Sequence, residues 1–226
     1  MTAAEIIAKS QQIHRRLGAG LATWLKAAKR QHSGKITCRK GCDHCCRLMV
    51  MSFTFEGVLI ANRLLRTGAS GINVIKKFQD DGQAQRSLIQ EYTSAGVREQ
   101  HDLAAKAWFR KGEPCPLLVG SLCSAYDIRP LSCASHYVVT PPCQCGPPDG
   151  QDIGTINATP LFARAMNYNA ELVSAIWEKP DWSTWPEPLG SAVVGGYILL
   201  AKGVEEYRSV MLIESAEPTP ASVEQD

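Results

Sequence analysis

The 226-residue sequence contains no internal repeat, no low-complexity block and no long run of like charge. Its 24 Lys and Arg nearly balance its 22 Asp and Glu, which argues against a dedicated nucleic-acid or membrane-surface protein. The hydrophobic fraction of 45% is too high for a disordered chain. The chain is therefore expected to bury a core of its own.

Signals for export and membrane insertion are also missing. The N-terminal residues are amphipathic and lack the apolar core and cleavage site of a signal peptide. The most apolar stretch, residues 191–201, is shorter than the ~20 residues that a membrane-spanning helix needs. We therefore expect a cytoplasmic protein with no membrane segment, whose thiols meet a reducing environment.

Motifs of several enzyme classes are absent as well. The sequence has no G-x-x-x-x-G-K-[ST] phosphate loop, no G-x-G-x-x-G after a strand and no G-x-S-x-G nucleophile elbow. Nothing in it therefore supports a nucleotide-binding protein or a hydrolase.

Strand-like alternation is scarce, whereas helical periodicity recurs along the chain. Thr2 and Glu5 match a capping box at the start of a first helix. Further helices are predicted over residues 54–65, over 72–110 with a break near Gly96, from Pro160 to about Lys179, and over 190–212. In the helix at 54–65, the inward residues are predicted to be Phe55, Val58, Leu59 and Leu65.

The segment between these helices has a different composition. Residues 115–150 are rich in Pro, Gly and Cys and are predicted to be mostly loop, and residues 181–188 are predicted to form a turn. The predicted fold class is mostly α with little β, in which helices surround a loop-rich, cysteine-ligated metal site.

The predicted organisation has four parts. They are an N-terminal helical arm (1–35), a cysteine-cluster domain (36–150) with inserted helices (53–110), C-terminal helices packed on that domain (151–213), and a disordered tail (214–226).

What the sequence does contain is cysteine. There are nine, an odd number that fits poorly with a closed set of disulfides. Four of them form the pattern C-x3-C-x2-C-C, namely Cys38, Cys42, Cys45 and Cys46. This spacing brings several sulfurs within reach of one metal ion or iron–sulfur cluster. Because the last two are adjacent, their side chains are expected to diverge, so they either serve different sites or leave one spare.

A second set of cysteines is spaced too widely to form a site alone but could complete one with the first set. These are Cys115, Cys123, Cys133, Cys143 and Cys145. We expect Cys115, Cys123, Cys133 and Cys143 to be metal ligands, although the sequence leaves open whether Cys143 or Cys145 ligates.

Taken together, the two sets resemble a known family. The C-x3-C-x2-C-C segment is followed by Cys115-Pro116-Leu117-Leu118 and then by C-x2-Y-x2-R-P-x2-C, which ends at Cys133. This order is similar to that of the YkgJ-type cysteine-cluster family, whose members are described as zinc- or iron-chelating proteins. The resemblance covers residues 38–145 and implies an iron–sulfur or zinc centre, without a defined reaction.

Other residues near the cysteines are expected to support the centre rather than ligate it. Glu56 falls where many relatives carry an acidic residue. Arg129 either hydrogen-bonds the metal region or pairs with Glu56, and Tyr126 is expected to pack with its hydroxyl satisfied. His136 follows Cys133 closely, but a role as ligand or proton donor is not favoured.

The leading functional hypothesis is an iron–sulfur protein with an oxidoreductase or electron-carrier role, and whether it is an enzyme stays open. The alternative is a structural zinc module for partner binding, or a protein for metal chelation or delivery. The adjacent pair Cys45-Cys46 and the number of cysteines favour iron. The expected partner is an unidentified protein or redox partner, and nucleic acid is not expected.

A minor alternative is an enzyme of the radical S-adenosylmethionine type. Cys38, Cys42 and Cys45 match the C-x3-C-x2-C arrangement of those enzymes. The sequence lacks the alternating βα pattern that their barrel requires, and His44 stands where they usually carry an aromatic residue.

Overall fold

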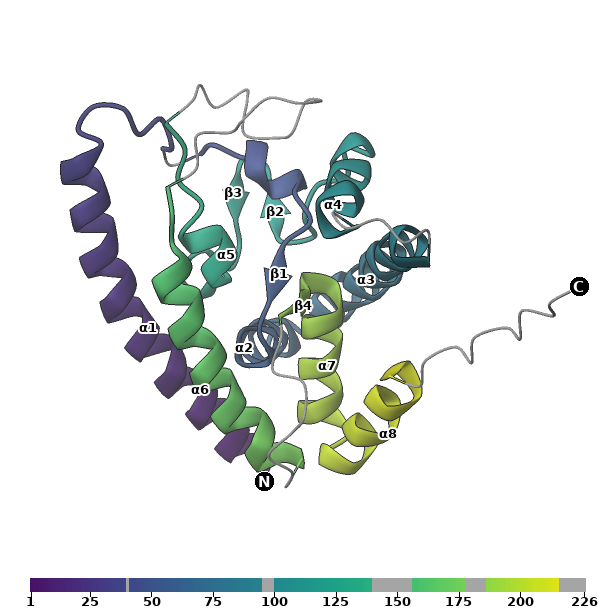
Figure 1. Cartoon of the computed structure of the whole chain (residues 1–226). Helices are drawn as coiled ribbons and strands as arrows, with labels where there is room; N and C mark the ends of the chain where they lie inside the picture. The colour runs from purple at the N-terminus through teal and green to yellow at the C-terminus, as the bar shows by residue number, and fades with distance from the viewer. Residues whose placement is uncertain (40, 95–99, 140–155, 178–185, 216–226) are drawn as a thin grey trace, which may run out of the picture.

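The computed structural model describes residues 1–39, 41–94, 100–139, 156–177 and 186–215. Helices dominate these residues, which confirms the predicted mostly-α fold class (Figure 1). The α-helices are α1 (Ala3–Gln31), α2 (Thr54–Leu65), α3 (Ala69–Ser94), α4 (Gln100–Arg110), α5 (Leu131–Ala134), α6 (Thr159–Trp177), α7 (Leu189–Ala201) and α8 (Val204–Ser215). The short elements are the 3-10 helices η1 (His44–Arg47) and η2 (Tyr126–Ile128) and the strands β1 (Met51–Ser52), β2 (Leu118–Val119), β3 (Leu122–Cys123) and β4 (Glu187–Pro188).

Helix α1 begins with the predicted capping box. The backbone N–H of Glu5 donates to the Thr2 hydroxyl at 3.3 Å, and the N–H of Thr2 donates to the Glu5 carboxylate at 2.7 Å. Ile6 and Ile13 are buried on the face that packs against α2 and α6. The N-terminal segment therefore belongs to the same apolar cluster as the C-terminal helices, and Figure 1 shows α1 running alongside α6.

Helix α2 lies at the centre of the molecule and has the predicted bounds. Its burial goes further than predicted, because residues 53–61 are buried on every side of the helix. Leu64 is buried and Leu65 only half-buried, so the predicted inward residue is one position off. Helix α7 packs closely against α2 and crosses it where the backbones of Gly57 and Gly196 come together.

The region predicted as one or two helices over 72–110 forms α3 and α4. The predicted break at Gly96 lies outside the described residues. Helix α3 packs on both α4 and α7.

The C-terminal helices correct one prediction. Helix α6 has Pro160 in its first turn, as predicted, and its predicted end at Lys179 lies outside the described residues. The single helix predicted over 190–212 is wrong, because Gly203, at φ +98°, turns the chain between α7 and α8. Of the predicted tail, residues 214 and 215 belong to α8, and 216–226 lie outside the described residues.

Two small antiparallel sheets interrupt the loops. Strands β1 and β4 pair with Met51 opposite Pro188, so the end of the segment predicted as a turn is a strand. Strands β2 and β3 form a hairpin that turns at Gly120, at φ +60°, within the segment predicted to be loop. Each strand has two residues, which is too short to produce a period in the sequence.

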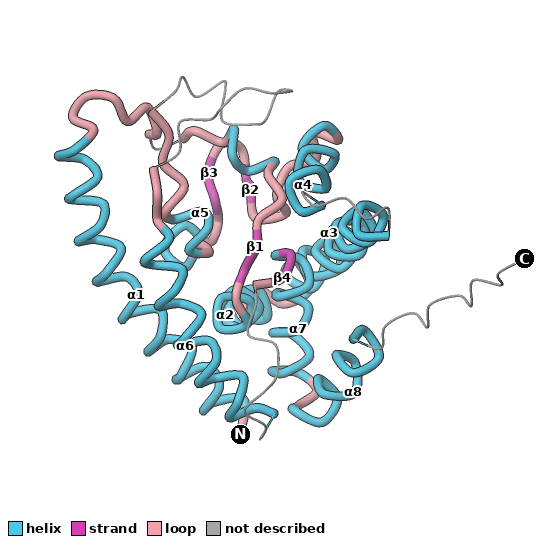
Figure 2. Tube along the Cα trace, in the orientation of Figure 1, coloured by secondary structure: helices cyan, strands magenta, loops and turns pink. Residues whose placement is uncertain are grey.

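A second apolar cluster supports the cysteine-bearing segments. It joins α2, α3 and α7 through Ile60, Phe78 and Val193, and Cys115 and Cys123 pack against its edge. Figure 2 shows the loops and short strands gathered toward one end of the helices. The cysteine-bearing segments therefore pack against α2, α3 and α7.

Within the described ranges, no helix combines the length and the apolar character that crossing a membrane would require.

Candidate metal centre

Two chain segments far apart in sequence, residues 38–46 and 115–133, bring the described cysteines into one region. Seven free, half-buried thiols lie there, those of Cys38, Cys42, Cys45, Cys46, Cys115, Cys123 and Cys133. Cys45 and Cys46 lie in η1, Cys123 in β3 and Cys133 in α5. The predicted ligand Cys143 and its alternative Cys145 lie outside the described residues.

Backbone hydrogen bonds join the two segments. The N–H of Cys115 donates to the carbonyl of Cys46 at 2.7 Å, and the N–H of Thr37 donates to the carbonyl of Val138 at 3.1 Å. The N–H of Val138 also donates to the Cys38 sulfur at 3.4 Å. The first cysteine segment is therefore fixed to the second through main-chain atoms as well as through sulfur.

The adjacent thiols of Cys45 and Cys46 converge instead of diverging as expected. A hydrogen bond from Cys46 lowers the pKa of Cys45 to about 7, while burial opposes this shift. The same hydrogen bond, followed by burial and by the charge on Cys45, raises the pKa of Cys46. The hydrogen bond thus favours the thiolate form of Cys45 and the thiol form of Cys46.

Burial also raises the pKa of four other thiols, those of Cys38, Cys115, Cys123 and Cys133. Burial raises the pKa of Cys133 well above its ordinary value, and thiolates at Cys115, Cys45 and Cys123 raise it further. Burial likewise raises the pKa of Cys115 to about 11, with a contribution from Cys123. Because these sulfurs are close enough for each charge to oppose the next, the group can ionise together only around a positive charge.

Glu56 fixes the helix that carries Cys133. This side chain is 3% exposed, and its Oε1 accepts a hydrogen bond from the N–H of Leu131 at 2.6 Å. Its Oε2 accepts from the N–H of Phe53 at 2.9 Å and from the hydroxyl of Ser52 at 3.0 Å. Burial raises the pKa of Glu56 to about 7, although these three donors favour the charged form.

Arg129 does not form the pairing with Glu56 that was one of its two predicted roles. Its guanidinium lies over the Tyr126 ring, 4.2 Å from the ring centroid. From there its charge helps to lower the pKa of Cys45 and opposes the burial that raises the pKa of Cys38 and Cys123. The positive charge of Arg129 therefore favours the thiolate form of cysteines in both segments.

Tyr126 differs from its predicted packing role. It is 56% exposed, so its ring supports Arg129 from the solvent side rather than filling the core. The neighbouring Asp127 accepts two hydrogen bonds from Arg63 of α2, at 2.5 and 2.6 Å, which lower the pKa of Asp127 to about 2. This ion pair attaches η2 to α2.

His136, for which a role as ligand is not favoured by the sequence, has a buried ring nitrogen. This Nε2 has no hydrogen-bond partner among the described residues, and burial lowers the pKa of the ring. Its carbonyl accepts a weak hydrogen bond from the Cys38 thiol at 3.9 Å. The ring is therefore a neutral imidazole with an unpaired nitrogen, and the backbone of the same residue contacts Cys38. Its only signal in the sequence is its closeness to Cys133.

The donor set fits a sulfur-ligated metal in its chemistry. Thiols and one imidazole are the ligands of zinc and of iron–sulfur clusters, and the unpaired nitrogen of His136 is a buried polar atom that a ligand would satisfy. In the part of the chain that is described, no three His, Cys, Asp or Glu side chains already stand in the arrangement of a metal-ion site. A metal that binds here would have to draw the thiols together.

No protein-family model, curated protein or solved structure matches this chain.

Proposed function

We propose that this protein binds metal through its cysteines and that the centre is an iron–sulfur cluster. The observation that carries the proposal is the presence of seven thiols from two distant segments in one region, where several of them affect the ionisation of others. A structural role as small buried hydrophobes would not require so many thiols in one place.

Electrostatics argues for a bound cation. Burial and mutual repulsion raise the pKa of Cys115 and Cys133, so without a cation these thiols stay protonated at neutral pH. A metal ion or cluster reverses this, because thiolates are then stabilised by direct bonds to positive charge. Arg129, within reach of both segments, would offset part of the negative charge of a polythiolate centre.

The number of ligands favours an iron–sulfur cluster over a single structural zinc. A tetrahedral zinc site uses four ligands, whereas seven thiols and the His136 nitrogen are available among the described residues.

Membership of the YkgJ-type family and a cytoplasmic, reducing location form part of the same proposal. A redox role with a protein partner would follow if the cluster changes oxidation state. The described sheets are two-stranded and antiparallel, which gives the radical S-adenosylmethionine alternative no barrel.

Metal analysis after anaerobic purification tests the proposal. Wild-type protein is expected to carry iron and acid-labile sulfide together and to absorb broadly near ~400 nm. Cys45→Ser and Cys133→Ser, one from each segment, are expected to lose most of this metal and to melt at lower temperature, because metal binding is coupled to folding. Ser124→Ala, an exposed neighbour of Cys123, is the control and should keep full metal content.

The outcomes separate the two metals. Stoichiometric zinc without sulfide would overturn the iron–sulfur cluster but keep the metal centre. Wild-type protein that is free of metal, with unchanged melting of both cysteine variants, would overturn the metal centre itself.

A further inference from the structure

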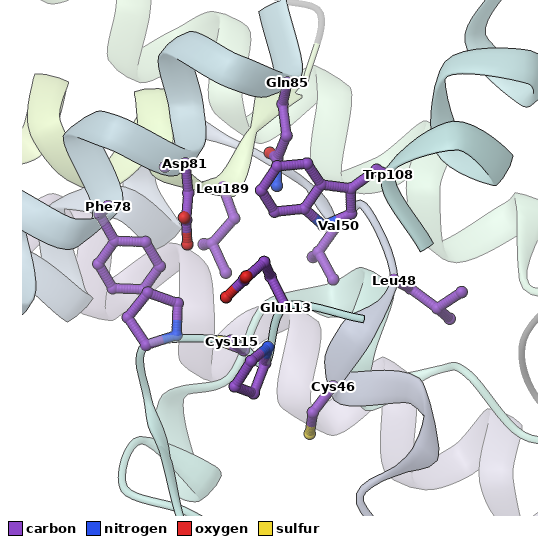
Figure 3. A pocket seen from close by; sticks show the side chains of 13 residues that line it. Cys46, Leu48, Val50, Phe78, Asp81, Gln85, Trp108, Glu113, Cys115 and Leu189 are labelled. Atoms are coloured by element: carbon purple, nitrogen blue, oxygen red, sulfur yellow. The ribbon is translucent and has the colours of Figure 1, made fainter. Parts of the chain in front are cut away.

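A small cavity lies beside the cysteine region, on the side facing α3 and α4. It has a volume of about 30 Å³ and reaches from Cys46 and Cys115 to the start of α7 (Figure 3). A space of this size holds one water molecule or one ion rather than an organic substrate.

Two carboxylates face this cavity. Asp81 comes from α3, and Glu113 comes from the segment that follows α4 (Figure 3). Within the described ranges, neither side chain takes part in a hydrogen bond or an ion pair. Burial raises the pKa of Asp81, Lys77, one turn earlier on α3, opposes the rise, and the charges of Glu113 and then Asp80 add to it. Two carboxylates thus lie near each other, and Lys77 offsets only part of the effect of burial and repulsion on Asp81.

A third oxygen points to a ligand independently of the acids. Gln85 lies one turn after Asp81 on the same face of α3, and its amide end faces the cavity (Figure 3). Only 6% of Gln85 is exposed, and its Oε1 is buried without a hydrogen-bond partner among the described residues. Buried amide oxygens are seldom left unpaired unless water or an ion completes them.

We propose that this cavity binds one divalent cation of the oxygen-preferring class, Mg²⁺ or Mn²⁺, through Asp81, Glu113 and Gln85. Carboxylate and amide oxygens are the donors that such ions prefer, and one or two carboxylates with retained water suffice for Mg²⁺. Thiol-seeking metals are drawn to the cysteines instead, so the two sites select different metals. The inference rests on different ligands from those of the proposed cysteine centre and stands or falls separately.

Titration with Mn²⁺ tests the site on the full chain, purified anaerobically, with free Mn²⁺ followed by electron paramagnetic resonance. Wild-type protein is expected to bind one Mn²⁺ per chain, and Mg²⁺ should displace it. Asp81→Asn is expected to weaken binding by about tenfold or more, since even the loss of a partner to a metal ligand has effects of that size. Asp80→Asn is the matched control, because Asp80 is an exposed neighbour on α3 that does not line the cavity.

Gln85→Leu gives a second readout. Without added cation, this variant should melt at a higher temperature than wild type, because an unpaired buried oxygen is removed. It should also bind Mn²⁺ more weakly. The proposal is overturned if wild type shows no saturable Mn²⁺ binding, or if Asp80→Asn and Asp81→Asn weaken binding equally. It is also overturned if Mn²⁺ binding is unchanged in Asp81→Asn but lost in Cys45→Ser.

Discussion

Glu56 connects three parts of the molecule through one carboxylate. It caps the N-terminus of α2 through Phe53, holds Ser52 at the end of β1, and fixes α5 through Leu131. Two effects oppose each other at this residue, because burial penalises the charge that the three donors stabilise. The outcome is a pKa of about 7, so burial is the larger effect.

The titration of Glu56 predicts how stability depends on pH. Because its pKa rises from 4.5 to about 7 on folding, the native state binds the proton more tightly, and stability falls as pH rises through that window. The fall should level off above pH 7, and its full size corresponds to about 3 kcal/mol. Glu56→Gln should flatten this slope in urea unfolding followed from pH 4.5 to 7.5.

Besides changing how stability depends on pH, the Glu56→Gln substitution should lower stability itself. The Gln amide places a donor against a backbone donor, so Glu56→Gln should lose about 1–3 kcal/mol at low pH. Glu91→Gln, on an exposed position of α3, is the control and should keep the wild-type slope. An identical pH slope in Glu56→Gln and wild type would contradict the assignment.

At this scale the sequence indicates which residues matter but not what they bind. The resemblance singles out Glu56, yet its partner is the N–H of Leu131, 75 residues away. The sequence places Arg129 near the cysteines or Glu56, but it does not indicate the ring of Tyr126, on which the guanidinium lies. His136 has no motif at all, because an unpaired ring nitrogen is a property of the packed chain.

At the scale of elements, the crossing of α2 and α7 allows the central helix to be buried on every side. Glycines let the two backbones touch, since a Cβ on Gly196 would lie 2.6 Å from the carbonyl carbon of Gly57. A Cβ on Gly57 would collide with the carbonyl of Ala192. Neither obstacle is a flexible side chain, so the helices would have to separate.

Alanine substitutions at two glycines should therefore have opposite signs. Gly196→Ala is expected to destabilise the fold by about 1–3 kcal/mol or more, because overpacking forces the backbones apart. Gly18→Ala, at an exposed position of α1 with no atom within 4 Å of the new Cβ, should stabilise it by about 0.5–1 kcal/mol. Urea unfolding measures both, and equal effects at the two positions would contradict the crossing geometry.

The elements that the sequence predicts well are those with a clear helical period of apolar residues. The bounds of α2 and the start of α1 follow from strong apolar patterns and a capping box. The turn at Gly203 has a local signal, a glycine at positive φ just past a helix, but the apolar period that continues on both sides of it favours one helix. The two-residue strands leave no pattern to detect.

At the scale of the whole molecule, the two cysteine segments are attached to the helices mainly by hydrogen bonds and at the edge of one apolar cluster. Glu56 and Arg63 attach the second segment to α2, and the Cys46–Cys115 backbone bond attaches the first segment to the second. The apolar clusters, by contrast, bury large side chains from several helices. Most of the folding free energy should therefore reside in the helices, and local stability should be lowest around the thiols.

Removal of metal should accordingly loosen one region rather than unfold the chain. After anaerobic chelation under reducing conditions, amide hydrogen exchange is expected to speed up in residues 36–48 and 113–139, because the thiols lose the cation that holds them together. Amides of α2 and α7 should keep their protection, since these helices pack chiefly on each other and on α1 and α3. Loss of protection throughout α2 and α7 would mean that metal supports the entire fold. No change anywhere would mean that the thiols hold no metal, because the segments would then be equally ordered before and after chelation.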